Sequence, residues 1–486
     1  MSDKIKWKPD RLSNTSLYMQ IVDYVKGQVA GGQWKPGFRI PSQRKLVEIL
    51  GVNRSTVGIA IDELVSQGIL KTETGSGTFV EDDTFNPLAG PVSVKDMYRY
   101  HGLFSDHFNS VQAAGELTGI TEYIDLGSYY MSEELAPKSY IEKTLEYVAS
   151  ELDRPNHLPP LGHLGLRKEI VRKLADKGIR ANPENILITS GTIHSLHLIS
   201  LALIKINTDI YSEETGYINP FNVFPAMNIN LRNLPMDEGG ISVNKLARSV
   251  QKNVNPALLY MTPDYQTPAS ITMSHARQQK LLKLCTQNKI IIIEDDTFSD
   301  LWFDKKPPVP LKALDINGIV LYLGTVSQTL SASLRIGWIV GPKLVIKQLS
   351  NIMTQIDYGE SSLSQVILKD LLETGAYGRY MDKLRLQLKA RRDFMLSLLE
   401  IHLKELCTWI IPNGGHYILL WFNEGLPVDK LYDLAMQEKV VLDLNPIISN
   451  QKVTAISLSY SYVDYKEMVI AIRRLKKIVV ELINPK

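Results

Sequence analysis

Residues 321–340 have the sequence LYLGTVSQTLSASLRIGWIV, and this stretch decides the fold of the larger part of the chain. Its pattern predicts an apolar strand, a loop rich in Ser and Thr, and then a second, buried strand. The second strand is entered through Leu334-Arg335-Ile336-Gly337. A cation placed directly before a buried strand favours a site for an anion. Pairing of Arg335 with a carboxylate is the alternative.

Further apolar runs rich in β-branched residues lie on both sides of this stretch and alternate with helix-like segments. Helices are predicted at Leu196–Ile204 and His275–Gln287, and strands are predicted at 186–190, 208–214, 257–262, 290–296 and 319–324. This alternation indicates an α/β domain with a mostly parallel sheet that helices cover on both faces. From about residue 385, a long amphipathic helix leads to shorter strands, which predicts a small α+β C-terminal lobe.

The first eighty residues predict a separate module. Apolar residues at helical spacing indicate a helix over 17–32, and Ser42 and Asn53 are placed to cap two further helices over 43–50 and 54–67. The buried stripe of the third helix is predicted to consist of Val57, Ile61, Leu64 and Val65. Residues 69–80 predict two short strands around a Gly75-Ser76-Gly77 tip. Three helices and a hairpin make a winged helix-turn-helix.

The third helix of such a module enters the DNA major groove with its N-terminus first, so base contacts are expected in its polar first turn. The expected contacts there are Arg54, Ser55 and Thr56, and Arg44 on the second helix is expected to contact a phosphate or a base. Gly75 and Gly77 at the wing tip allow a close approach of the backbone to the minor-groove side. Arg39 and Lys45 could be merely solvated side chains.

Composition is that of an ordinary globular protein of two to four domains, with 486 residues, 44% hydrophobic and 22% charged. Residues 1–80 hold 11 Lys and Arg against 7 Asp and Glu, and the remainder is nearly neutral. A basic end fits a nucleic-acid contact about as well as it fits ordinary surface variation. No apolar run is long enough for a membrane span, and the polar N-terminus lacks a signal-peptide core. Cys285 and Cys407 have no disulfide or metal spacing, so a reducing cytoplasm is expected.

Two family resemblances follow from these motifs. The N-terminal module is similar to the GntR-family DNA-binding module and matches its pattern PSxRxLaxxLGVxRxTVxxAxxxLxxxGxxxxxxGxGTFV almost throughout. The order and spacing of elements over about 120–486 resemble a fold-type I aminotransferase. Together they resemble a MocR-type regulator, a transcription factor whose effector domain is a repurposed aminotransferase. The resemblance implies operator DNA, a homodimer that usually has swapped DNA-binding modules, and three parts: residues 1–80, a linker over 81–120, and the effector domain over 121–486.

Several features of the family's pyridoxal phosphate (PLP) site persist. The turn 189-TSGTIHS-195 lies between a strand and a helix, where backbone N–H groups could hold a phosphate. The resemblance assigns the pyridinium contact to Asp295, although this aspartate could instead bond only to its own backbone. The full set of positions that the resemblance implies for a cofactor or other ligand is Gly191, Thr192, Ile193, Tyr217, Asp295, Thr325, Ser327 and Arg335.

The departures from the family are more numerous. The family's S-K-T motif has an arginine seven residues after the lysine, and Gln328 stands at the lysine position. That lysine forms an imine with PLP and later moves a proton, and an amide can do neither. Thr297 and Phe298 replace a tyrosine that bonds the ring hydroxyl, and Ser457 replaces an arginine that binds the substrate carboxylate. The usual N-P-T-G turn has the sequence Thr267-Pro268-Ala269-Ser270, and a tyrosine from the neighbouring subunit falls near His157.

These substitutions predict a DNA-binding regulator without catalytic residues, without covalently bound PLP and without a metal. Three states of the effector domain are left open: weakly held PLP, a different small-molecule ligand, or a body that only dimerises. The competing hypothesis is an active PLP-dependent aminotransferase that carries a DNA-binding module. A membrane is not among the expected partners.

Overall fold

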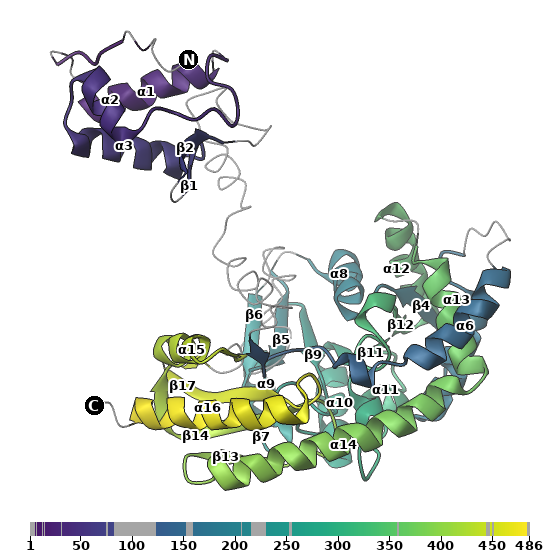
Figure 1. Ribbon diagram of the computed structural model, residues 1–486. Helices are drawn as coiled ribbons and strands as arrows, with labels where there is room; N and C mark the ends of the chain where they lie inside the picture. Colours follow the sequence, from purple (N-terminus) through teal and green to yellow (C-terminus); the bar gives the residue numbers. More distant parts are fainter. Residues whose placement is uncertain are drawn as a thin grey trace. The chain divides into compact units, whose positions relative to one another are not determined.

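The structure is a computed structural model, and the chain divides into two compact units, residues 1–113 and 114–486 (Figure 1). It describes residues 5, 7–11, 13, 15–30, 32–73, 76–81, 123–151, 159–205, 207–214, 230–251, 255–356, 359–443, 448–449 and 452–483. The predicted linker over 81–120 therefore lies outside the described residues, except for Glu81. None of the described helices is long and apolar enough to cross a membrane.

The first unit confirms the predicted winged helix-turn-helix. Its elements are α1 (Leu17–Ala30), α2 (Gln43–Leu50), α3 (Arg54–Ser66), β1 (Leu70–Glu73) and β2 (Gly77–Val80). Ser42 caps α2 as predicted, because its side chain accepts a hydrogen bond from the backbone N–H of Lys45. Gly51 ends α2 in the left-handed conformation, at φ 67°. These local signals fix the turn between α2 and α3.

Two details of α3 differ from the prediction. Asn53 precedes the helix but makes no side-chain capping bond. Val65, which the sequence pattern predicts in the buried stripe, is 37% exposed, whereas Ala60 is completely buried. Small Ala60 lets α3 lie close to its neighbours, so the contact face of the helix includes Ala60 in place of Val65.

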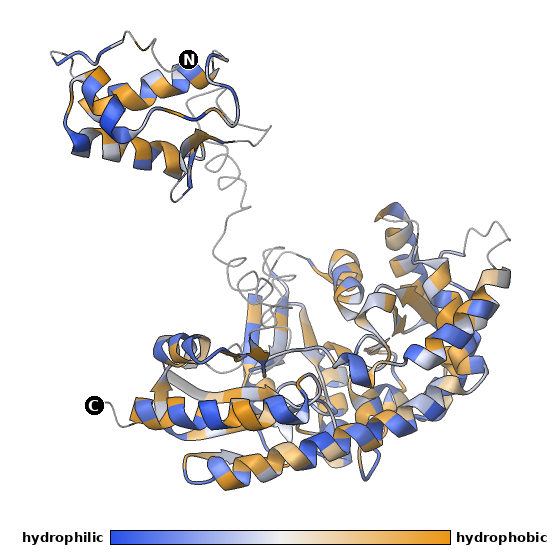
Figure 2. Ribbon diagram, in the orientation of Figure 1, coloured by the Kyte–Doolittle hydropathy of each residue, from blue (hydrophilic) through white to orange (hydrophobic). Residues whose placement is uncertain are grey.

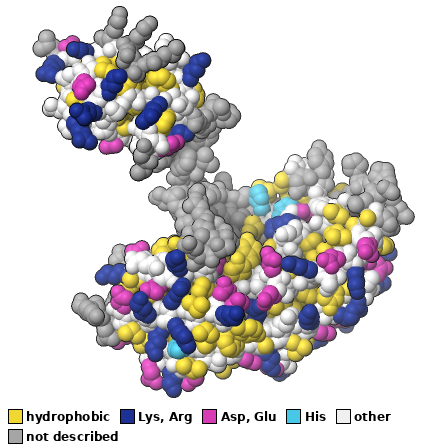
Figure 3. All heavy atoms as spheres, in the orientation of Figure 1, with side chains coloured by type: hydrophobic (Ala, Val, Ile, Leu, Met, Phe, Trp, Pro, Cys, Tyr) yellow, Lys and Arg dark blue, Asp and Glu magenta, His cyan; other side chains and the backbone are white. Residues whose placement is uncertain are grey.

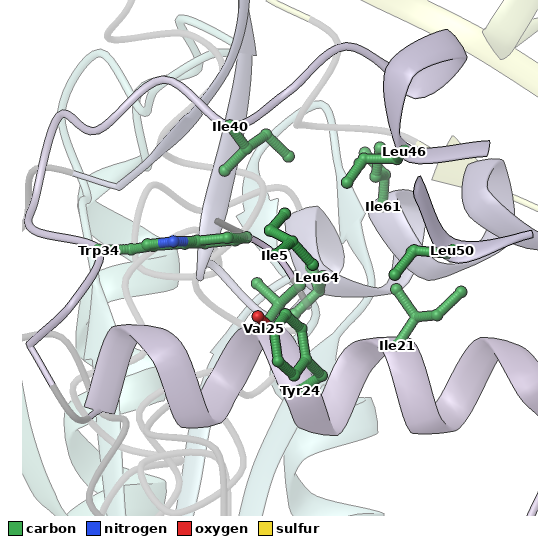
Figure 4. Close-up of a pocket in the computed structure, with 10 residues that line it drawn as sticks. All are labelled: Ile5, Ile21, Tyr24, Val25, Trp34, Ile40, Leu46, Leu50, Ile61 and Leu64. Carbon is green, nitrogen blue, oxygen red and sulfur yellow. The ribbon is translucent and has the colours of Figure 1, made fainter. Parts of the chain in front are cut away.

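The core of this module is closely filled. Its helices and the wing bury a set of large apolar side chains around a void of only about 10 Å³ (Figure 4). The residues that line the void are Ile5, Ile21, Tyr24, Val25, Trp34, Ile40, Leu46, Leu50, Ile61 and Leu64. A void this small is comparable to a single water, so the module is a rigid scaffold and offers no ligand cavity here.

The second unit is built on a seven-stranded sheet in the order β4-β12-β11-β10-β9-β5-β6. Its strands are β4 (Ile186–Thr189), β12 (Gly337–Val340), β11 (Val320–Thr325), β10 (Ile291–Asp295), β9 (Ala257–Met261), β5 (Asp209–Glu213) and β6 (Asn230–Leu234). The predicted mostly parallel sheet is confirmed, and β12 is the exception because it runs antiparallel to both β4 and β11. Most of these strands are buried on both faces, which explains their continuous apolar runs.

Helices cover both faces of this sheet (Figure 1). Leu187 and Ile339 face a core formed with α8 (Thr192–Leu203) and α12 (Lys343–Ile356). Residues of the opposite face contact two further cores, which include α6 (Lys138–Glu151), α7 (Leu164–Ala175), α9 (Val243–Gln251), α10 (His275–Gln287), α11 (Leu311–Leu314) and α13 (Ser362–Glu373). This two-faced burial confirms the predicted α/β class.

The small lobe follows the long helix α14 (Ala376–His402), which begins earlier than the predicted start near residue 385. Blue and orange stretches alternate along α14 and α16 (Tyr465–Ile483), as expected for helices buried on one side (Figure 2). The lobe has the antiparallel sheet β13-β14-β17-β16, made of β13 (Cys407–Trp409), β14 (Tyr417–Pro427), β17 (Lys452–Ser459) and β16 (Ile448–Ser449). Leu419 and Ala455 of this sheet contact Ala269 in the large part of the unit.

The remaining elements are short or peripheral. They are α15 (Val428–Gln437), β3 (Ile124–Asp125), β15 (Val440–Val441), β7 (Met236–Asp237), β8 (Gly240–Ile241) and the 3-10 turns Glu133–Leu135, Pro183–Asn185, Ser299–Leu301 and Ala332–Leu334. Strands β3 and β15 pair in parallel, so the chain before α6 is attached to the small lobe.

Candidate functional site

The predicted DNA-contacting residues lie on exposed parts of the N-terminal module. Arg54 and Ser55 are exposed in the first turn of α3, and Thr56 is partly exposed. Arg44 is exposed on α2. Among the described residues, neither arginine forms a hydrogen bond or an ion pair, so both guanidinium groups are available to a partner. Basic side chains are distributed over the visible face of this module (Figure 3).

The wing tip is described only in part, because Gly75 lies outside the described residues. Gly77 begins β2 at φ 127°, a conformation that favours glycine. The roles of all these residues in DNA binding stay predictions.

In the second unit, four of the predicted ligand-binding residues converge on one point at the N-terminus of α8. A Cβ atom placed on Gly191 would lie 3.7 Å from Arg335 Nη2, 3.7 Å from Ser327 Oγ and 3.9 Å from Thr325 Oγ1. Two hydroxyls and a guanidinium therefore surround the space in front of the first backbone N–H groups of a helix. We call these four residues the anion cup, because the guanidinium of Arg335, the hydroxyl of Ser327 and the backbone N–H groups of the helix N-terminus can donate to an anion.

The cup is fixed by backbone contacts. Thr325 Oγ1 donates to the carbonyl of Ile336 at 2.9 Å and accepts from the N–H of Ser327 at 3.1 Å. A Cβ on Gly337 would come within 2.7 Å of the Cα of Gly191, so β12 and the start of α8 touch directly. The geometry is thus set by two glycines that lie back to back.

Arg335 adopts the left-handed conformation at φ 49° and is exposed. Within the described part of the chain its guanidinium forms no hydrogen bond or ion pair. The structure therefore gives no support to the alternative in which this arginine pairs with a carboxylate of its own chain.

A carboxylate lies beside the cup. Ser190 donates a short hydrogen bond to Glu360, and His194 Nδ1 lies 2.8 Å from Glu360 Oε1. The contact between Glu360 and the turn that contains Ser190 was not predicted, because 170 residues separate the two in the sequence.

Asp295 lies at the end of β10 and is only 3% exposed. It accepts hydrogen bonds from Tyr260 Oη at 2.7 Å and from the backbone N–H of Thr297 at 3.1 Å. Burial raises the pKa of Asp295 to about 6, against the opposite effect of the hydrogen bonds from Thr297 and Tyr260. The carboxyl group is thus hydrogen-bonded to the side chain of Tyr260 as well as to the backbone of Thr297, and each of its oxygens can accept further bonds.

Gln328 follows β11 and is partly buried. The imidazole of His416 lies near its backbone and is 1% exposed. Burial lowers the pKa of His416 to about 4, with a smaller opposing effect of the Gln328 backbone. The ring centroids of His416 and Phe298 are 5.7 Å apart. A neutral histidine and a phenylalanine therefore lie close to the position where the resemblance places the reactive lysine.

Neither nitrogen of His416 has a full hydrogen bond among the described residues. Sequence reasoning missed this residue. The available signal was the preceding Gly414, where a Cβ would lie 2.6 Å from Leu301 O and 2.6 Å from the ring of Tyr265. Such a glycine marks a point where the small lobe approaches the large part of the unit.

Ser457 is buried on the small lobe and donates to Asp443 Oδ2 at 3.3 Å. Tyr129 donates a short hydrogen bond to the same carboxylate. Asp125 is also near, because burial and then the charge of Asp443 contribute to raising the pKa of Asp125 to about 6. Where the resemblance implies an arginine for a substrate carboxylate, the chain therefore has a serine bonded to a carboxylate.

A buried ionic network lies under the loop that contains Gln328. Lys177 Nζ is 2.6 Å from Asp296 Oδ2 and 2.9 Å from Asp300 Oδ1, and Lys173 is paired with Asp300. Burial opposes the charged form of Lys177, but the two carboxylates outweigh it and raise its pKa. The hydroxyl of Tyr377 lies within hydrogen-bonding distance of both Asp300 Oδ2, at 2.9 Å, and Thr329 Oγ1, at 3.3 Å. Both lysines are therefore held by carboxylates.

Not every residue expected at this site is among the described residues. Tyr217 and His157 lie outside the described residues. Ile193 is 38% exposed, so only its backbone can serve the cup. Among the described residues, no group of His, Cys, Asp and Glu could hold a metal ion.

Comparison with known families supports both units. Residues 121–463 match the family described as aminotransferase class I and II, and residues 17–80 match the family described as bacterial regulatory proteins, gntR family.

Whole-length relatives are transcriptional regulators. The chain is 37% identical over 459 residues to an uncharacterized HTH-type transcriptional regulator, YisV, of Bacillus subtilis (strain 168), with 94% of each chain covered. It is 35% identical to YdfD of the same organism, with 97% of this chain and 98% of that one covered. It is 30% identical to the HTH-type transcriptional regulator NorG of Staphylococcus aureus (strain bovine RF122 / ET3-1), with 87% of this chain and 95% of that one covered.

Solved structures similar to the chain are aminotransferases. An archaeal alanine:glyoxylate aminotransferase has a TM-score of 0.71 at 28% identity and covers 78% of this chain and 96% of its own. Kynurenine aminotransferase from Pyrococcus horikoshii has a TM-score of 0.73 at 25% identity and covers 80% of this chain and 99% of its own. The fold of the second unit is therefore shared with enzymes, while the relatives that match both units are regulators.

Proposed function

Because the chain belongs to the gntR family of bacterial regulatory proteins and carries an aminotransferase class I and II domain, we propose that it is an operator-binding transcriptional regulator that has lost transamination. Its second domain would sense a small anionic ligand, and the protein would act as a homodimer. The observation that carries the loss of catalysis is Gln328, in the loop between β11 and β12. An amide has no basic amine with which to hold or release a carbonyl carbon.

The surroundings of Gln328 support this proposal. Lys173 and Lys177 are held by Asp296 and Asp300, so neither supplies a free amine. Phe298 has no phenol. A bound amino acid would meet Ser457 and Asp443 instead of a cation, and that pair repels a carboxylate.

The anion cup supports a ligand with a phosphate or a similar anion. An exposed arginine side chain without a partner, the hydroxyl of Ser327 and a helix N-terminus together favour a doubly charged group. The residues of the cup fit the phosphate group of PLP. When PLP is bound in aminotransferases, its pyridine ring supplies an electron sink, and Asp295 can still accept a hydrogen bond from the ring nitrogen. They do not fit a covalent attachment, and no cofactor is expected to be covalently bound.

The wild-type chain is accordingly expected to bind PLP reversibly. Absorbance should show no band that borohydride fixes to the protein, and dialysis should remove the ligand. Inorganic phosphate should compete for the cup, and Arg335→Gln should weaken binding by about 10–100-fold, the loss typical of a charged hydrogen bond. Arg379→Gln, an exposed arginine on α14, is the matched control and should leave binding unchanged.

A borohydride-fixed adduct in the wild-type chain, or amino-group exchange with amino acids, would instead favour an active aminotransferase with a DNA-binding module. If neither inorganic phosphate nor Arg335→Gln weakened the binding of PLP, the proposed role of the cup would be contradicted.

For the N-terminal module, Arg54→Ala is expected to weaken binding to a duplex selected from a random library by about 1–3 kcal/mol, if Arg54 makes a bidentate base contact. Fluorescence anisotropy at one fixed salt concentration measures the change. Binding to an unrelated duplex should change much less, because non-specific binding depends on phosphates. Equal losses on both duplexes would reduce Arg54 to a phosphate contact.

A further inference from the structure

Residues 38–40 form a third strand-like segment beside the wing. The carbonyl of Phe38 accepts from the N–H of Val80 at 2.9 Å, and the N–H of Ile40 donates to the carbonyl of Thr78 at 3.0 Å. Arg39 and Phe79 are therefore direct neighbours across this pairing. The connection between α1 and α2 thus contributes one edge of the wing.

The side chains of this small sheet divide between two faces. Ile40, Leu70 and Val80 are buried in the module core. Since neighbouring residues alternate, Arg39 and Phe79 lie on the opposite face, together with Lys71, which pairs with Phe79. The outer face of the wing therefore carries Arg39 and Lys71, together with Glu73, which lies two residues from Lys71 on the same face.

Arg39 leans along this face toward the wing tip. Its backbone lies opposite Phe79, but a Cβ on Gly77 would be 2.9 Å from Arg39 Nε and 3.3 Å from Arg39 Nη2. The guanidinium also lies 6.0 Å from the centre of the Phe79 ring. Absence of a side chain at Gly77 leaves room for the cation, so the charge is carried two residues closer to the tip than the backbone of Arg39.

Arg39 is also the uncommitted cation of the wing. It is exposed, and within the described residues it forms no hydrogen bond or ion pair. Lys71, by contrast, lies 3.9 Å from Glu81. Glu73 lies opposite Gly77 but forms no ion pair with Arg39 among the described contacts. The interpretation of Arg39 as an ordinary solvated side chain does not account for this placement.

We propose that Arg39 inserts into the DNA minor groove next to the major-groove site of α3, and that it gives the protein a preference for A·T pairs at that flank. A narrow A·T minor groove has an enhanced negative potential that attracts arginine without any base-specific hydrogen bond. The planar guanidinium, already held against Phe79, loses little freedom when it enters the groove. The inference rests on the proposed DNA binding.

The test is selection of binding sites from a random duplex library with the full chain and three variants. Wild type should select a core sequence with A·T-rich flanks. Arg39→Gln should select the same core without the flanks, bind an A·T-flanked duplex about tenfold more weakly, and show a salt dependence reduced by about 0.9 in log–log slope. Lys35→Gln is the matched control, because it also removes one exposed positive charge. Lys35 lies two residues before Gly37, whose N–H donates to the carbonyl of Val80, at the opposite end of β2 from Gly77.

Arg39→Lys separates groove entry from simple phosphate neutralisation. It should keep the salt slope but lose most of the A·T preference. Retention of the flanks by Arg39→Gln or by Arg39→Lys, or a wild-type consensus without A·T flanks, overturns the proposal. Failure of the wild-type chain to select any core would instead overturn DNA binding itself. Circular dichroism melting establishes that the exposed substitutions leave the module folded.

Discussion

The Gln328→Lys variant is expected to take up PLP covalently, with a visible absorbance band that borohydride fixes to residue 328. The anion cup and Asp295 can position the phosphate and the ring, so the missing amine is the main chemical deficit. Peptide mass spectrometry after reduction measures occupancy, which should rise from none in the wild type to nearly one adduct per chain.

Two controls accompany this experiment. Ser333→Lys adds an amine to an exposed position of the same loop and should give no specific adduct. Gln328→Met removes the amide without adding an amine and should behave like the wild type. Absence of the band in Gln328→Lys would mean that His416 and Phe298 have already made the cleft unsuitable for the ring.

Lys177→Met is expected to lower the free energy of unfolding by about 3–5 kcal/mol, because it leaves a buried carboxylate without its counter-charge. Asp296 is the residue affected most, since Asp300 keeps its pair with Lys173. Urea unfolding of the full chain at neutral pH measures the change.

Lys404→Met is the matched control. Lys404, just after the end of α14, forms an exposed ion pair with Glu400 at 3.7 Å, so its loss should cost at most about 1 kcal/mol. In the wild type, Lys173 and Lys177 overcome the effect of burial and hold the pKa of Asp300 well below its usual value, so its pairing persists until strongly acidic pH. Equal losses of unfolding free energy in Lys177→Met and Lys404→Met would contradict a structural role for the buried ionic network.

The parts of the fold that follow from local chemistry could be predicted from the sequence. Helix α10 has the predicted ends, because Ser274 caps it and accepts from the N–H of Arg277. The alternation of apolar strands and helices predicted the α/β class. The antiparallel direction of β12 was not predicted, since it depends on where Gly337 must lie against Gly191 and not on its own apolar pattern.

In the candidate site, the residues grouped by short motifs came together as predicted. Gly191, Thr325, Ser327 and Arg335 form one cup, although its function stays a prediction. The sequence missed His416 and Asp443, because both come from the small lobe and meet their neighbours through tertiary packing. Neither position has a motif of its own, and the chemical character of the cleft depends on such long-range contacts.

The direct contact between Gly191 and Gly337 makes the backbone of the cup much less tolerant of substitution than position 328. The side chain at position 328 can be exchanged while the backbone stays where it is, so reactivity can be lost or regained in a single step. A side chain on Gly337 would force β12 and the start of α8 apart, because its Cβ would come within 2.7 Å of the Cα of Gly191. Reactivity at position 328 therefore depends on one side chain, whereas the contact between β12 and α8 that shapes the cup depends on the backbone of two glycines.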